Sequence, residues 1–247
     1  INVKNYIEKL IIIFICFLPS IYFWSSAVGK EPFTYLATGI LLNSFSKNKI
    51  KFHYIAIAFL LILTVRPFMA GFLAIAIAIG LIIKPNKYIF ITFPFIITFL
   101  ISFLAYVIFY LKRLNIPIFH NFESFVNFID RRKSDTLANE FTDMTNEGFL
   151  YHFFSYIFRP LPFERLDFMS ILSGLENIIL IVIMFICLKK INIKKIYNNN
   201  LTILLIYSLV TCFFLVIATY NLGVAIRQKW FFLLPLFFIL LVNKQTK

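Results

Sequence analysis

The sequence has few charged residues for its length and few glycines. Only 14% of its 247 residues are charged and only 7 are glycine, whereas 61% are hydrophobic and 19% are aromatic. A soluble domain of this size cannot cover so much apolar surface, so the composition excludes an ordinary soluble globular protein. We therefore expect an integral membrane protein.

Motifs for metals, nucleotides and nucleophilic serine are also lacking. Cys16, Cys187 and Cys212 lie inside apolar runs without CxxC spacing, so we interpret them as small hydrophobic residues. The histidines have no HxxxH or HExxH context, and no GxGxxG, Walker or GxSxG motif occurs. We accordingly expect no metal site and no soluble cofactor.

Long apolar runs bounded by polar clusters predict an all-α fold, a polytopic transmembrane helix bundle of about eight membrane segments in a single domain over residues 1–247. Several runs are shorter than the roughly 20 residues that a straight spanning helix needs. The runs are 10–27, 33–46, 52–65, 67–83, 88–111, 171–188, 201–220 and 230–243.

The runs 52–65 and 67–83 are separated only by Arg66. Pro67 lacks a backbone donor and disfavours helical geometry at Arg66. We expect a tight helical hairpin, or a broken helix, with Arg66–Pro67 at its apex. The alternative is one long kinked helix in which Arg66 is buried.

Lysine and arginine occupy different sets of polar segments. Thirteen lysines, no arginine and one acidic residue lie in segments 1–9, 47–51, 84–87, 189–200 and 244–247, whereas all seven arginines lie elsewhere. Cytoplasmic loops collect positive charge, so we expect these lysine segments and both chain ends in the cytoplasm. On this interpretation the net charge of +13 anchors loops and does not indicate a nucleic-acid partner.

The segment 112–170 is then a long extracytoplasmic loop, which is more typical of a functional segment than of a linker. Within it, Phe122, Phe125, Val126 and Ile129 have the spacing of an amphipathic helix. The aromatic run 149–158 suits the lipid headgroup layer. The alternative is that residues 121–133 form a helix that only rests on the bilayer surface.

Isolated charges beside apolar runs are the candidate functional residues. An arginine at bilayer depth is costly unless it is paired or hydrated, so Arg66 is a functional candidate by default, and Arg227 follows the same logic. Glu176, inside a predicted span, is a candidate counter-ion. The remaining outer-face candidates have simpler alternatives, namely a Lys30–Glu31 pair and contacts of Arg159 and Arg165 with lipid phosphate.

Several stretches occur in an order that resembles a known family. They are PSIYFWSSAVGKEP, LTVRPFMAGFLAI, YIFRPLPFE, LEN and YNLGVAIRQKWFFLLP. Together they resemble the multi-spanning repeat-unit polymerases of bacterial O-antigen and capsular-polysaccharide gene clusters, over most of residues 10–243. Because the chain begins with Ile1, we also expect it to be the C-terminal part of a longer protein.

The resemblance implies an enzyme of the bacterial cytoplasmic (inner) membrane. There, a growing glycan would leave its undecaprenyl pyrophosphate carrier on the outer face and join another lipid-linked repeat unit. Membrane lipids, a flippase and a chain-length regulator of the same pathway would be further partners. The expected site consists of cations that bind pyrophosphate and a carboxylate base: Lys30, Arg66, Arg159 and Arg227 for binding, and Glu31 or Glu164 for catalysis.

Other functions fit the same residues. A lipid-linked oligosaccharide flippase would need cations along a cavity between two related halves. A membrane glycosyltransferase that uses a polyprenyl-phosphate sugar should carry an acidic pair in its first outer loop. A glycan ligase shares the chemistry and differs in its acceptor, and a structural membrane subunit is the fourth alternative.

Overall fold

The computed structural model describes residues 15–83 and 148–244, apart from 16, 46–49, 165, 189–195, 198–200 and 220. Every regular element in this part of the chain is a helix, so the all-α prediction is confirmed there. The run 88–111, the amphipathic segment 121–133 and Arg165 lie outside the described residues. The helices are α2 (Pro19–Ser26), α3 (Glu31–Ser44), α4 (Phe52–Val65), α5 (Pro67–Ile83), α8 (Phe149–Phe158), α9 (Phe168–Leu188), α11 (Thr202–Ala218), α12 (Leu222–Gln228) and α13 (Trp230–Lys244).

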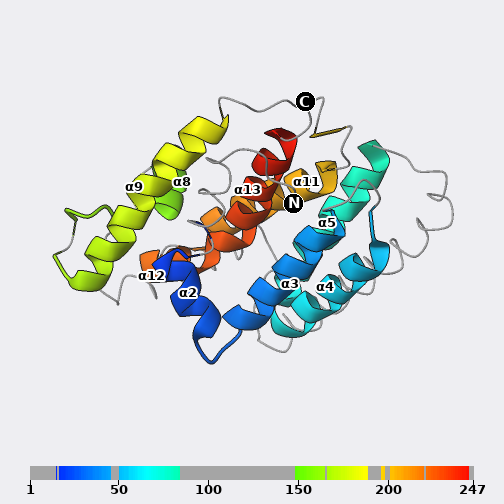
Figure 1. Cartoon of the computed structure of the whole chain (residues 1–247), viewed down its shortest axis with the longest axis horizontal. Helices are drawn as coiled ribbons and strands as arrows, with labels where there is room; N and C mark the ends of the chain where they lie inside the picture. The colour runs from blue at the N-terminus through cyan, green and yellow to red at the C-terminus, as the bar shows by residue number, and fades with distance from the viewer. Residues whose placement is uncertain are drawn as a thin grey trace, which may run out of the picture.

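The expected break at Arg66 is present. Arg66 ends α4 with φ −142° and ψ 79°, and Pro67 begins α5. The Arg66 N–H donates to Ile62 O, while its carbonyl accepts from the N–H groups of Met69 and Ala70. Because α4 and α5 also pack against each other, the two helices form a hairpin and not one kinked helix (Figure 1).

Two other boundaries differ from the sequence-based expectation. The run 10–27 is not one continuous helix, because Leu18 is non-helical and α2 begins at Pro19, a residue suited to the first turn. The segment between α11 and α13 contains a helix that was not predicted, α12. The Asn221 side chain caps it by accepting a hydrogen bond from the Val224 N–H at 3.2 Å.

The core forms where α5, α11, α13 and α3 pack together (Figure 1). Small residues bring two of these helices close. A Cβ atom on Gly80 would lie 2.5 Å from Cγ1 of Ile203, so only glycine permits this approach of α5 to α11. Aromatic side chains of α13 fill the centre, including Trp230, Phe231 and Phe237, all nearly inaccessible to solvent.

In the described part of the chain, two helical stretches are long and apolar enough to cross a membrane, Phe168–Ile186 and Leu222–Leu241. Four further apolar helices are shorter, at 10–17 residues: α4, α5, α8 and α11. The number of membrane segments, predicted as about eight, therefore stays a prediction.

Several described junctions between helices lie on one side of the bundle. The helix α2 and the beginning of α3 lie at the lower left in Figure 1, near α12, and the ion pair between Arg66 and Glu31 connects the α4–α5 junction to them. The helices α5, α9 and α13 run from this side to the upper end of the bundle (Figure 1). Segments far apart in sequence thus meet at the lower left, and these segments carry most of the candidate functional residues.

Candidate functional site

Arg66 and Glu31 form a buried ion pair. The Nη2 atom of Arg66 donates to Oε1 of Glu31 at 2.8 Å, and the two residues are only 7% and 8% exposed. The break between α4 and α5 places Arg66 here, while Glu31 occupies the first turn of α3, where the helix dipole favours a negative charge. The pairing offsets the cost of burying both charges.

Arg227, in the last turn of α12, approaches the same carboxylate oxygen. Its Nη1 lies 3.7 Å from Oε1 of Glu31, and its side chain is 34% exposed. Aromatic rings cover both guanidinium groups: Arg66 lies over Phe231 at 4.9 Å and Arg227 over Trp24 at 5.6 Å. We call Glu31, Arg66 and Arg227 the arginine cluster.

The arginine cluster has one cation more than it has anions, since two guanidinium groups share one carboxylate. The Nε atoms of Arg66 and Arg227 are both buried, and neither has a hydrogen-bond partner within the described residues. Burial lowers the pKa of Arg66 and the Glu31 charge opposes this effect. Because a buried N–H without a partner is unfavourable, the cluster is suited to receive an anionic group with several oxygen acceptors.

Two further predicted site residues, the binding candidate Arg159 and the catalytic candidate Glu164, pair with each other. The Nε atom of Arg159 donates to both carboxylate oxygens of Glu164, at 2.8 and 3.0 Å. A second nitrogen of Arg159 donates to the Tyr151 hydroxyl at 2.8 Å. The ion pairs of the described residues thus join Arg159 to Glu164 and join neither residue to the arginine cluster.

Lys30 precedes Glu31 of the arginine cluster in the sequence, but its side chain is exposed. It is the N-cap residue of α3, and its carbonyl accepts hydrogen bonds from the Thr34 N–H and hydroxyl. Glu31 pairs with Arg66 and Arg227, so the expected alternative in which Glu31 pairs only with Lys30 is wrong. Lys30 is positioned at the surface of the site.

The sequence-based reasoning missed a second buried cation, Lys229, which is only 1% exposed. Its Nζ atom donates to Oδ1 of Asn177 and to the Ile157 carbonyl, the latter at 3.3 Å. The Asn177 amide in turn donates to the carbonyl of Pro160 at 2.9 Å. In the sequence, Lys229 lies between Arg227 and the first residue of the apolar helix α13. This position is typical of a lysine at a membrane surface, so the sequence did not indicate its burial.

Glu176 lies next to Asn177 and adds a charge of opposite sign. Its Oε1 atom accepts a hydrogen bond from the Ser20 N–H at 2.7 Å, so it caps the first turn of α2 from another helix. Its neighbour Asn177 accepts a hydrogen bond from Lys229, so the acid and the buried lysine belong to one group of contacts, and a counter-ion role for Glu176 stays a prediction. Trp230 Nε1 donates to the Ser20 hydroxyl at 3.0 Å. We call Ser20, Glu176, Asn177, Lys229 and Trp230 the lysine network.

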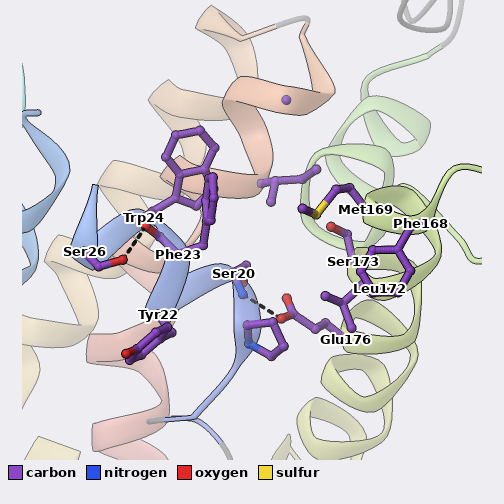
Figure 2. Close-up of a pocket in the computed structure, with 13 residues that line it drawn as sticks. Ser20, Tyr22, Phe23, Trp24, Ser26, Phe168, Met169, Leu172, Ser173 and Glu176 are labelled. Carbon is purple, nitrogen blue, oxygen red and sulfur yellow. Dashed lines mark hydrogen bonds between the residues drawn. The ribbon is translucent and has the colours of Figure 1, made fainter. Parts of the chain in front are cut away.

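A cavity of about 530 Å³ lies between α2, α9 and α12. Figure 2 shows Phe23 and Trp24 of α2 facing Phe168 and Met169 of α9 across this space, with Glu176 bonded to Ser20 at its wall. Apolar and aromatic groups dominate the wall. The lining residues are Pro19, Ser20, Tyr22, Phe23, Trp24, Ser26, Phe168, Met169, Leu172, Ser173, Glu176, Gly223 and Ile226.

Comparison of the chain with models of known protein families, with curated proteins and with solved structures found no match. Within the described residues, no group of three or more histidine, cysteine, aspartate or glutamate side chains could hold a metal ion.

Proposed function

We propose that this chain is a membrane enzyme of surface-polysaccharide biosynthesis, which polymerises undecaprenyl-pyrophosphate-linked repeat units on the outer face of the bacterial cytoplasmic membrane. The observation that carries the proposal is the arginine cluster, in which two arginines share one carboxylate and the buried Nε of each has no hydrogen-bond partner among the described residues. Such a site favours a ligand with two or more phosphate oxygens.

The chemistry is a glycosyl transfer. A hydroxyl oxygen of the acceptor sugar forms a bond to the anomeric carbon of the donor glycan, and the bond from that carbon to the pyrophosphate oxygen breaks. The bonding electrons leave with the pyrophosphate, whose charge rises in the transition state. Arg66 and Arg227 stabilise this developing charge through fixed N–H donors, the arrangement that lowers a barrier most effectively.

The acceptor hydroxyl loses its proton during this step, and a carboxylate must accept it. Glu31 is the stronger candidate, because it lies within the arginine cluster. Both oxygens of Glu164 accept hydrogen bonds from Arg159, whereas the ion pairs of Glu31 within the described residues involve only its Oε1 atom. In this proposal Arg159 and Glu164 stiffen the turn that precedes α9, and Lys30 attracts the anionic substrate from the surface.

A flippase for lipid-linked oligosaccharides is the main competing proposal. The residues that line the cavity include no arginine or lysine, although a transport path for pyrophosphate would need cations along it. The cations instead gather at one end of the bundle, where α2, α12 and the α4–α5 junction meet (Figure 1). This arrangement favours a reaction site over a transport path.

The test compares Arg227→Ala with a control variant, Lys51→Ala. Lys51 is the N-cap residue of α4, at the end of that helix away from Arg66. If the proposal is right, Arg227→Ala cells accumulate single repeat units on the carrier lipid, and an external glycosidase can reach them. Lys51→Ala cells keep normal polymer. Single units that are protected from the glycosidase would instead indicate a transport defect and would contradict the polymerase proposal.

A further inference from the structure

We infer that the cavity between α2, α9 and α12 binds the first isoprene units of a polyprenyl pyrophosphate, with the pyrophosphate on the neighbouring arginine cluster. This inference rests on the proposed function, and it adds where the hydrocarbon of the carrier lies.

The cavity wall suits hydrocarbon and not sugar. Its volume of about 530 Å³ is within the range of small-molecule pockets. A water molecule occupies roughly 30 Å³ in the liquid. If each carbon atom of the chain takes a similar volume, the cavity holds on the order of fifteen carbon atoms. The carboxylate oxygen of Glu176 at the wall already accepts the Ser20 N–H, and a sugar with many hydroxyl groups would find few partners along the apolar remainder.

The rim of the cavity is apolar and open to the surroundings. Phe23 is 56% exposed on α2, while Phe168 and Met169 are 76% and 63% exposed at the start of α9. Exposed apolar side chains that border a pocket mark a surface that contacts another apolar phase. In a bilayer this rim faces lipid, so a long hydrocarbon chain can enter from the membrane and continue into it beyond the cavity.

One wall of the cavity leads directly to the arginine cluster. Trp24 lines the cavity, and its ring lies 5.6 Å from the guanidinium carbon of Arg227. Ile226, the residue before Arg227, lines it as well. An amphiphile with hydrocarbon in the cavity would thus have its anionic head beside a cluster that carries a net positive charge. This complementarity selects a polyprenyl pyrophosphate over a neutral lipid.

The experiment uses a matched pair of substitutions on α9. Leu172 lines the cavity, whereas Leu175, one turn further along, does not line it and is 50% exposed. Leu172→Trp fills the space, and Leu175→Trp adds the same bulk outside it. The full-length protein in vesicles is labelled with a polyprenyl phosphate that carries a diazirine near the phosphate. Ile226→Phe fills the cavity from α12 and serves if Leu172→Trp does not fold.

We expect cavity filling to reduce labelling of α2 and α9 by about tenfold, equal to about 1.4 kcal/mol, while Leu175→Trp has no effect. Unlabelled undecaprenyl phosphate should compete, and phosphatidylglycerol should not. Equal labelling of the matched pair would overturn the inference, as would equal competition by phosphatidylglycerol, since ordinary lipid would then occupy the cavity. If cavity filling abolishes labelling but polymer length stays normal, the cavity binds the lipid and the proposed function is wrong.

Discussion

The arginine cluster and the lysine network both bury cations at the same end of the bundle, but they give these cations different hydrogen-bond and ion-pair partners. In the lysine network, Lys229 donates to Asn177 and to a backbone carbonyl. In the arginine cluster, two guanidinium groups share a single carboxylate, and their Nε atoms have no hydrogen-bond partner in the part of the chain that the structure describes.

We interpret this difference as one between a structural site, the lysine network, and the binding site that we propose, the arginine cluster. A buried polar group that has hydrogen-bond partners on several helices holds those helices together, because moving any of them would break hydrogen bonds in a low dielectric. A buried cation with unused N–H donors is destabilising, and a ligand that accepts hydrogen bonds from these donors removes that cost. The lysine network joins α2, the turn after α8, α9 and the α12–α13 junction, whereas the arginine cluster is open to an anion.

The largest expected effect comes from Arg66→Lys, which keeps the charge but loses the planar fork. Loss of one preorganised donor at a developing negative charge slows the reaction about a hundredfold or more. Surface polysaccharide should therefore be absent or much shorter on a gel, while the protein still accumulates in the membrane. Normal chain lengths in the Lys variant would rule out the phosphate-binding role of Arg66.

Next in size is Glu31→Gln, which separates proton acceptance from charge balance. The amide cannot accept a proton as a base does, so we expect polymer formation to fall by about a hundredfold or more. The cluster would gain one unit of positive charge, so binding of pyrophosphate should strengthen. Calorimetric titration of the purified protein with pyrophosphate measures this, and weaker binding would show that Glu31 mainly holds Arg66 in place.

Lys229→Met tests the structural side of the comparison. Methionine has similar length and no charge, but it leaves Asn177 Oδ1 and the Ile157 carbonyl without this donor, at a cost of about 1–3 kcal/mol each. Thermal unfolding in detergent should move to lower temperature, while activity per folded molecule falls by less than tenfold. A variant that is stable but inactive would assign Lys229 to the binding site instead.

Arg159→Gln should have the smallest effect. The Arg159–Glu164 pair is partly exposed, with side chains 13% and 18% accessible, so its contribution is about 1 kcal/mol or less. We expect polymer of nearly normal length and a slightly lower unfolding temperature. If polymer is lost as completely as in Arg66→Lys, Arg159 belongs to the pyrophosphate site after all, as the resemblance implied.

Much of the local structure followed from sequence pattern. The apolar runs predicted α4, α5 and α11 to within two residues, and Pro67 predicted the break at Arg66. The isolation of Arg66 in apolar sequence identified it as a candidate. The prediction missed α12, a short helix whose sequence has too little periodicity to be recognised. Its N-terminus is stabilised by the Asn221 side chain, which accepts a hydrogen bond from the Val224 N–H.

From the sequence we could recognise an apolar, helical chain whose arginines lie apart from most of its lysines. These properties depend on composition and on spacing along one chain. Only the tertiary structure decided which charges meet. Glu31 and Arg66 are 35 residues apart, and Arg227 joins them from α12. Lys229, two residues later, turns inward instead and meets Asn177 of α9. The ion-pair partner of a buried charged residue depends on how the helices pack in three dimensions, because only the side chains of neighbouring helices lie close enough to pair with it.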